Sequence, residues 1–182
     1  MKQFPFILLP VFLMLSCNNI AQNKTSTTMN SKKVNNPYYS REDTAKVNVA
    51  EKEWNKLLSP KVYEVARQKG TELPFTGIYN KHKDVGTYYC TACGNPLFAS
   101  NGKFESNCGW PSFFEPITKG SIIYTPDNTH GMQRTEVTCG RCKSHLGHVF
   151  DDGPPPTGLR YCINSVSLDF EAAKKARDQS NQ

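Results

Sequence analysis

Hydrophobic positions follow two different periods along the chain, and the period changes near residue 71. Before that point apolar residues recur at helical spacing, namely at Trp54, Leu57, Leu58, Val62, Val65 and Ala66. Ser59-Pro60 predicts an N-cap followed by proline at the first helical position, and Gly70 predicts the end of the helix. We therefore expect short helices in this part of the chain.

After residue 71 the apolar runs are short, aromatic and β-branched, and they lie between clusters of Gly, Pro, Asn and Asp. The runs are Thr87–Tyr89, Lys103–Glu105, Ser121–Tyr124, Glu136–Thr138 and Val149–Phe150. Runs of this kind between turn residues are typical of β-strands. The sequence therefore predicts a mainly β body preceded by short N-terminal helices.

Near the C-terminal end, alternation places three polar side chains on one face of a predicted strand. Its apolar face is formed by Leu159, Tyr161 and Ile163. Arg160, Cys162 and Asn164 then project from the other face. A neighbouring guanidinium favours the thiolate, although most free cysteines are small buried hydrophobes. The apolar phase slips by one residue across Asn164-Ser165, which predicts a bulge or a break.

Charge is distributed unevenly between the start of the chain and the remainder. Residues 1–50 carry a net charge of +4, and the other 132 residues carry 16 basic and 14 acidic side chains. The predicted β body is therefore nearly neutral, which argues against a nucleic-acid partner. Basic residues in the leading segment suit a position near an anionic membrane surface.

The first residues resemble a bacterial lipoprotein signal. Lys2 precedes an uncharged run over residues 4–15, and Ser16-Cys17 follows. The run is too short for a stable membrane span. We expect cleavage before Cys17 and lipid attachment to its sulfur; plain secretion with a different cut is the alternative. The protein is then exported to the bacterial cell envelope, lipid-anchored or periplasmic.

Four segments follow from these patterns. Residues 1–17 form the signal segment, and residues 18–47, rich in Asn, Ser, Thr and Lys, are expected to be a flexible tether. Residues 48–170 form the folded domain. Residues 171–182 form a polar C-terminal tail.

Four of the seven cysteines form two Cys-x-x-Cys units, Cys90/Cys93 and Cys139/Cys142. Two such units supply the four thiolates of a closed, tetrahedral structural zinc site, although the separation between them exceeds the usual ribbon spacing. Disulfides are an alternative in an exported protein, but bridges that close such small loops remove little chain entropy. A local Cys₂His₂ cluster with His145 and His148 would leave the first unit without partners.

Cys108 lies in a loop punctuated by glycine and proline, Ser106–Ser112. One cysteine on a strand and one on a loop, far apart in sequence, is the arrangement of an attacking and a resolving thiol. Trp110 in the same loop is either an apolar wall for a small substrate group or part of the core.

Six segments together resemble the methionine-R-sulfoxide reductases, the MsrB family. They are Thr71–Tyr79, Tyr89–Cys93, Lys103–Phe114, Gly131–Glu136, His145–Gly153 and Thr157–Ser165. The resemblance extends over residues 51–170. It implies an antiparallel β fold of two small sheets with short N-terminal helices, and one structural zinc ion held by the four paired cysteines.

The resemblance also implies roles for single residues. Cys162 corresponds to the nucleophile, Cys108 to the resolving cysteine and Trp110 to a substrate-binding residue. The other matching active-site positions are His145, His148, Arg160 and Asn164.

The expected activity is the reduction of methionine-R-sulfoxide, mainly in proteins, to methionine. The reaction forms a sulfenic acid and then an intramolecular disulfide, which a thioredoxin-like protein reduces again. Oxidised proteins are the expected substrates, and a monomer is the expected state. Two other classes stay open at this point: a non-enzymatic zinc-ribbon binding module and a secreted domain held by disulfides.

Overall fold

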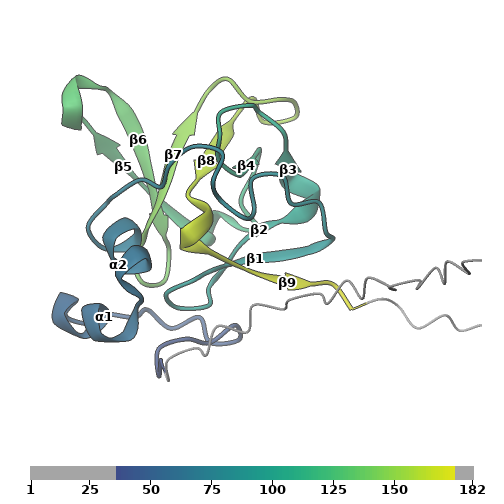
Figure 1. Ribbon diagram of the computed structural model, residues 1–182. Coiled ribbons are helices and arrows are strands. Elements are labelled where there is room, and N and C mark those ends of the chain that lie inside the picture. The colour runs from purple at the N-terminus through teal and green to yellow at the C-terminus, as the bar shows by residue number, and fades with distance from the viewer. Residues whose placement is uncertain (1–35, 175–182) are drawn as a thin grey trace, which may run out of the picture. The chain divides into compact units, whose positions relative to one another are not determined.

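The computed structural model describes residues 36–174 (Figure 1). Within this range two α-helices, α1 (Glu51–Leu57) and α2 (Pro60–Ala66), precede nine strands that form two antiparallel sheets. The predicted mainly β fold with short N-terminal helices is confirmed. The signal segment and Cys17 lie outside the described residues. No helix in the described range is long and apolar enough to cross a membrane.

The two helices are set by local signals. The chain is extended at Leu58 and Ser59, so one stretch of helical periodicity becomes two helices. The Ser59 side chain accepts a hydrogen bond from the Val62 N–H at 3.4 Å, which confirms the predicted N-cap. The helix ends earlier than predicted, because α2 stops at Ala66 and not near Gly70. The residue with a left-handed backbone after the helix is Lys69 (φ 59°) and not Gly70.

The smaller sheet has three strands in the order β2–β1–β9. They are β1 (Gly86–Cys90), β2 (Pro96–Ala99) and β9 (Leu168–Ala172). The larger sheet has six strands in the order β3–β4–β8–β7–β6–β5. They are β3 (Lys103–Phe104), β4 (Ser112–Phe113), β5 (Ile122–Asp127), β6 (Arg134–Cys139), β7 (His145–Phe150) and β8 (Arg160–Ile163). Figure 1 shows β5 and β6 as a hairpin that projects beyond the other strands.

Each of the five predicted strand runs overlaps an observed strand, but β2 and β4 were not predicted. The last predicted run was too short, because β7 begins at His145 and not at Val149. The predicted break at Asn164-Ser165 is confirmed: β8 ends one residue earlier, and a 3₁₀ turn leads to β9 in the other sheet. Strand β9 continues to Ala172, two residues beyond the expected end of the domain.

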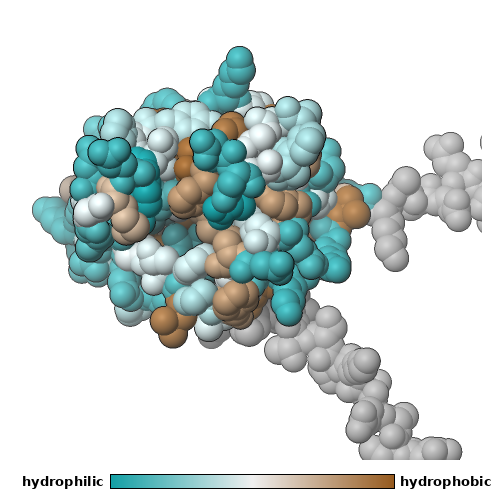
Figure 2. All heavy atoms as spheres, turned by 90° about the horizontal axis from the view of Figure 1, so that it is seen from above, coloured by the Kyte–Doolittle hydropathy of each residue, from teal (hydrophilic) through white to brown (hydrophobic). Residues whose placement is uncertain are grey.

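Aromatic side chains join the two sheets. Phe98 of β2 stacks on Phe113 of β4 with ring centroids 4.4 Å apart, and Tyr88 of β1 meets Phe113 edge-on at 5.1 Å. All three are fully buried, as is Tyr161 of β8. Aromatic pairs of this geometry add about 1 kcal/mol each beyond the burial of their area. On the face shown in Figure 2, exposed apolar side chains form small patches among polar ones.

An arm formed by residues 36–47 packs against the two Cys-x-x-Cys turns, although the sequence analysis assigned it to a flexible tether. Arg141, between Cys139 and Cys142, is 4 % exposed and lies under the arm. Its guanidinium donates to the carbonyls of Tyr38, Ser40 and Ala45 and to the Asp43 carboxylate. A buried guanidinium is tolerated only when its N–H groups are bonded in this way.

The other Cys-x-x-Cys turn also holds the arm. The Ser40 N–H donates to the Cys93 carbonyl at 3.0 Å, and Asn36 donates to the Ala92 carbonyl at 2.9 Å. Arg41 forms an ion pair with Asp169 of β9 at 2.9 Å. Few apolar residues are needed for this packing, because hydrogen bonds to backbone groups hold the arm. Composition alone therefore pointed to a tether.

Replacing the buried guanidinium should release the arm. We expect Arg141→Met to lower the free energy of unfolding by about 3 kcal/mol, because the arm's carbonyls lose a charged donor. Hydrogen exchange should accelerate at the Ser40 and Val47 amides, whose acceptors are Cys93 and Arg141. The control is Asp43→Asn at the 54 % exposed partner, which should change the free energy of unfolding far less. Unchanged exchange in Arg141→Met would contradict the arm's dependence on this residue.

Candidate functional site

The register of the larger sheet sets one row of side chains across five strands. Directly opposed residues are Thr125 and Glu136, Glu136 and His148, His148 and Cys162, and Cys162 and Ser112. Opposed residues in antiparallel strands point to the same face. The sheet therefore carries a carboxylate, an imidazole, a thiol and a hydroxyl side by side, while the other face packs in the core.

A β-bulge brings a second imidazole to this face. His145 and His148 are three residues apart, so a regular strand would point them to opposite faces. The register instead shifts so that Thr138 opposes His145 and Leu146 is the extra residue. The two imidazole rings lie 5.6 Å apart as a result. The sequence pattern gave no sign of this bulge.

Asn164 holds the bulge in place. Its side-chain amide donates to the Leu146 carbonyl at 3.1 Å, and its backbone N–H donates to the same carbonyl at 2.8 Å. Its side-chain oxygen accepts from the Glu72 N–H at 3.0 Å. Asn164 is 3 % exposed. The structure thus places this predicted site residue beneath the site, between the bulge and the loop that carries Glu72.

Glu72 is a residue that the sequence analysis did not single out, although it lies in the matched segment Thr71–Tyr79. Its buried carboxylate accepts from the N–H groups of Ser165 at 2.5 Å and Val166 at 3.0 Å. Its carbonyl accepts from the Trp110 indole N–H at 3.1 Å. Glu72 therefore orients Trp110, which is partly exposed rather than part of the closed core.

Among the described residues, the two cysteines outside the Cys-x-x-Cys units, Cys108 and Cys162, lie next to each other. The sulfurs of Cys108 and Cys162 are 3.3 Å apart, and both thiols are free. The Cys108 loop turns sharply through Asn107 and Gly109, both with positive φ. Fifty-four positions separate the two cysteines in sequence, but a disulfide needs little movement from here.

The thiol pair shares one negative charge, because two thiolates at this separation repel each other. The hydrogen bond from Cys162, helped by the hydroxyls of Ser106 and Ser112, lowers the pKa of Cys108 to about 4. The same hydrogen bond and burial raise the pKa of Cys162. Arg160 acts on Cys162 in the predicted direction, toward a lower pKa, but its effect is smaller.

Arg160 is itself held by neighbouring groups. Its guanidinium donates twice to the Asp152 carboxylate, at 2.8 Å each, and lies 4.4 Å from the Phe150 ring centroid. Phe150 and Arg160 are opposed in the β7–β8 ladder, so both share the face of Cys162. Arg160 lies on the same face as the Cys162 thiol, as the alternation in the sequence predicted.

His145 and His148 each contact a different carboxylate. His145 is 4 % exposed, and its Nδ1 lies 2.7 Å from Glu136, which also forms an ion pair with Lys69 at 2.8 Å. Burial lowers the pKa of His145, although Glu136 opposes this effect. Lys69 has a left-handed backbone and lies after α2, one residue before the predicted end of the helix. Its side chain neutralises the buried Glu136 carboxylate. His145 is therefore neutral at neutral pH.

The other pair is closer to solvent. His148 Nε2 lies 2.7 Å from the Asp127 carboxylate, which also forms an ion pair with Arg134 at 2.7 Å. Hydrogen bonds from the Thr129 hydroxyl and N–H and from His148 lower the pKa of Asp127, which stays ionised. The face of the sheet thus carries two imidazoles whose carboxylates differ in exposure.

The four remaining described cysteines form a separate cluster. Cys90 is the last residue of β1 and Cys139 the last residue of β6, and Cys93 and Cys142 lie in the turns that follow. All four ligand sulfurs lie within 4.8 Å of one another, and all are buried. The sulfurs of Cys90 and Cys142 are 3.7 Å apart, and those of Cys93 and Cys139 are 3.6 Å apart.

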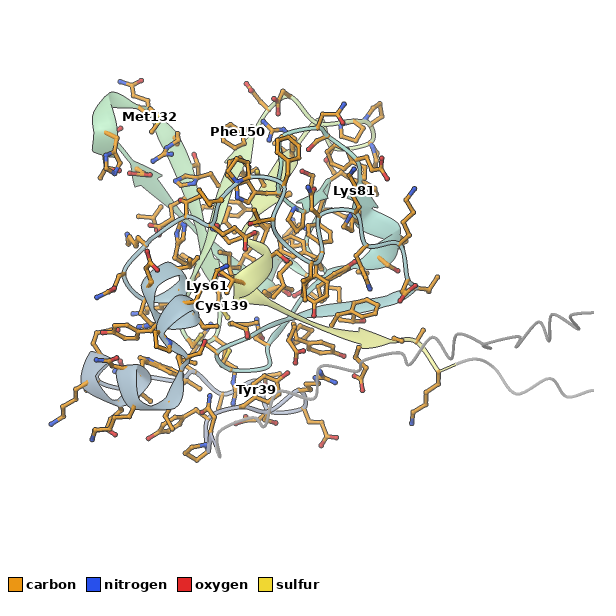
Figure 3. The ribbon with its side chains drawn as sticks, viewed as in Figure 1. Tyr39, Lys61, Lys81, Met132, Cys139 and Phe150 are labelled. Atoms are coloured by element: carbon orange, nitrogen blue, oxygen red, sulfur yellow. The ribbon has the colours of Figure 1, made fainter. Side chains whose placement is uncertain are left out.

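This cluster fits a tetrahedral zinc ion. Sulfurs about 2.3 Å from such an ion would be separated by about 3.8 Å, close to the distances above. The four thiols are not paired in disulfides. His145 and His148 bind carboxylates instead, so a Cys₂His₂ cluster does not form. Figure 3 shows Cys139 toward the arm, on the side of Tyr39, and Phe150 of the other site well away from both.

Comparisons with known proteins agree with this geometry. Residues 58–172 match the SelR domain family. The peptide methionine sulfoxide reductase MsrB of Pseudomonas putida (strain W619) is 61 % identical over 126 residues, which cover 69 % of this chain and 95 % of that protein. The chain belongs to the MsrB family. The MsrB protein of Leptospira interrogans serovar Lai is 55 % identical over 125 residues, covering 69 % and 95 % of the two chains.

Membership of the MsrB family excludes the two other classes that the sequence left open. A zinc-ribbon module would not account for the neighbouring thiols of Cys108 and Cys162. The described cysteines are all free, so they do not form the bridges of a disulfide-held domain. The matched segment ends at residue 172, where β9 also ends. The family thus describes the same unit that the sheets define.

Removal of metal should destabilise the fold, because the cluster joins a turn of each sheet. We expect chelation under reducing conditions to lower the melting temperature by more than about 15 °C, since four buried thiols would lose their common partner. Calorimetry with parallel metal analysis measures this effect. The control is the Cys108→Ser/Cys162→Ser double variant, which should keep both metal and melting temperature. An unchanged melting temperature after complete metal loss would refute the structural role.

Proposed function

We propose that this chain repairs oxidised proteins by reducing methionine-R-sulfoxide to methionine, with electrons from the Cys108–Cys162 thiols. Methionine sulfoxide reduction is the activity to which its MsrB relatives point. The observation that carries the proposal is the pair of sulfurs 3.3 Å apart, one strand away from two imidazoles. The four buried cysteines hold a structural zinc ion in this proposal.

The first step needs a thiolate and a proton donor on one sulfoxide group, whose oxygen leaves only when protonated. The Cys162 proton passes to Cys108 across their hydrogen bond, and the Cys162 thiolate attacks the substrate sulfur. A histidine protonates the oxygen. The attack forms a bond between the two sulfurs, and the protonated oxygen leaves the substrate as water. A water oxygen then adds to the Cys162 sulfur and loses a proton while the sulfur–sulfur bond breaks, which releases methionine and leaves Cys162 as a sulfenic acid.

His148 is the proton donor in this proposal. It lies directly opposite Cys162 in the ladder, and the ionised Asp127 carboxylate contacts its Nε2. The Asp127 carboxylate fixes the orientation of the ring and leaves Nδ1 as the nitrogen that can pass a proton to the sulfoxide oxygen. His145 is neutral because burial lowers its pKa, so it serves as a hydrogen-bond partner of the sulfoxide.

The second step forms a disulfide. The Cys108 sulfur attacks the Cys162 sulfenic sulfur, and the hydroxide leaves as water with the proton released from Cys108. A thioredoxin-like protein then restores both thiols by exchange. Trp110, oriented by Glu72, provides an apolar surface for the substrate methyl group. Arg160 offsets part of the burial cost of a Cys162 thiolate.

The location of the reaction is also part of the proposal. Lys2, the uncharged run after it and Ser16-Cys17 support export and lipid attachment at Cys17. The enzyme then acts in the bacterial cell envelope as a monomer on proteins that carry methionine-R-sulfoxide. Its reductant is a thioredoxin-like protein outside the cytoplasm.

The function is tested with R and S epimers of a chromophoric methionine sulfoxide peptide and dithiothreitol. We expect turnover of the R epimer only. Cys162→Ser should abolish it, whereas Cys108→Ser should retain it because dithiothreitol reduces the sulfenic acid directly. Turnover of neither epimer by the folded, metal-loaded chain would refute the proposal. Activity of Cys162→Ser would exclude Cys162 as the nucleophile.

The two histidines should differ as well. We expect His148→Gln to lower kcat/KM by about 10²–10³-fold, the usual contribution of a positioned proton donor. His145→Gln should cost only about tenfold, because glutamine retains a hydrogen-bond donor. Steady-state kinetics on the R epimer, with thermal melting to check folding, compares the matched pair. A larger loss in His145→Gln would reverse the assignment.

A further inference from the structure

Two serine hydroxyls contact the Cys108 sulfur, and the mechanism above does not use them. Ser106 Oγ donates to Cys108 Sγ at 3.0 Å, and Ser112 Oγ lies 3.4 Å from the same sulfur. The two hydroxyl oxygens are 2.6 Å apart. The Cys108 sulfur is therefore contacted by two hydroxyls that are hydrogen-bonded to each other, and also by the Cys162 thiol.

Both hydroxyls are positioned by the fold. Ser112 is on β4 directly opposite Cys162, and it is 1 % exposed. Ser106 lies two residues before Cys108, and the left-handed Asn107 (φ 57°) turns the chain between them. A Ser112 proton donated to Ser106 leaves the Ser106 proton for the sulfur. Hydroxyls linked in this way donate more strongly than isolated ones.

We propose that Ser106 and Ser112 act in the second step, where they stabilise the Cys108 thiolate that attacks the sulfenic acid. This inference rests on the proposed reduction of methionine sulfoxide. In the first step Cys108 receives the proton of Cys162, so it must lose that proton again before it attacks. By then Cys162 has no thiol to donate to Cys108, and the two hydroxyls are the donors that persist.

The step is balanced without a further reactant. An S–S bond forms between Cys108 and Cys162, and the S–O bond of the sulfenic acid breaks. The Cys108 sulfur is oxidised and the Cys162 sulfur is reduced. The thiol proton of Cys108 passes to the leaving hydroxide, which departs as water.

The charges around the sulfur agree with this role. The Cys162 thiol and Arg160, both on β8, are the titratable and charged groups that act on Cys108. Hydrogen bonds lower the pKa of Cys108, first from Cys162 and then, against burial, from Ser106 and Ser112. Ser106 and Ser112 have no hydrogen bond to the Cys162 sulfur among the described contacts, and without them Cys108 accepts the Cys162 proton more readily, so their removal should not slow the first step.

The experiment is a single turnover of the R epimer by the full, metal-loaded chain, quenched at intervals between pH 5 and 9. Methionine reports the first step, dimedone trapping reports the sulfenic acid, and mass spectrometry after alkylation reports the disulfide. We expect Ser106→Ala and Ser112→Ala to form the disulfide about tenfold more slowly at neutral pH. The apparent pKa of that step should rise by about one unit, while methionine release is not slowed.

Two variants separate this role from general loosening of the loop. Ser106→Thr keeps the hydroxyl and should restore the rate. Ser121→Ala removes a buried hydroxyl 3.0 Å from that of Thr118, away from the site, and should change neither step. Ser106 is partly exposed, so Ser106→Ala is decisive even if Ser112→Ala fails to fold.

Equal slowing of both steps, or an unchanged rate and pH profile of disulfide formation in Ser106→Ala, would overturn the inference. In either case normal methionine release from the wild-type chain would leave the proposed function standing. Absence of methionine from the wild-type chain would overturn the proposed function, and this inference with it.

Discussion

Four buried sulfurs join the two sheets of this protein, and the reactive face depends on that junction. One Cys-x-x-Cys turn follows β1 of the smaller sheet, and the other follows β6 of the larger sheet. Strand β7 begins three residues after Cys142, so the cluster sets where the strand that carries His145 and His148 begins. The thiolates of such a cluster need a cation at their centre, since four negative charges in a dry interior are otherwise prohibitive. In the proposed mechanism, chemistry at Cys162 therefore depends on a cluster that takes no part in it.

On this face of the larger sheet, two histidines and two cysteines differ in burial and in the groups that contact them. Two histidines have carboxylate partners at 2.7 Å, yet one imidazole is enclosed beside a neutralised glutamate and the other is nearer solvent. The thiol pair is divided in a similar way, because one sulfur receives the hydroxyls and the other the guanidinium. Like residues with unlike surroundings can then carry different protonation states at the same pH.

Sequence reasoning succeeded where chemistry or period is local. The Cys-x-x-Cys spacing, the alternation around Cys162, the break after it and the Ser59 cap were all readable from neighbouring residues. It failed where a partner is distant. The Leu146 bulge is visible only in the register with β6, and its lock, Asn164, comes from a different strand end. The arm has tether-like composition because Arg141, about 100 positions away, supplies its bonds. Long-range hydrogen bonds leave no local period to detect.

The packed arm bears on the proposed lipid attachment, because it shortens the chain between Cys17 and the fold. If lipid is attached at Cys17 as proposed, a tether ending at residue 47 would offer 30 residues, or about 105 Å when fully extended. Hydrogen bonds hold the arm to the fold from Asn36 onward, so at most residues 18–35 separate Cys17 from it. Those 18 residues span at most about 65 Å. In the proposed anchored form, the arm therefore limits the volume within which the site can meet its substrates, and Arg141 would determine reach as well as stability.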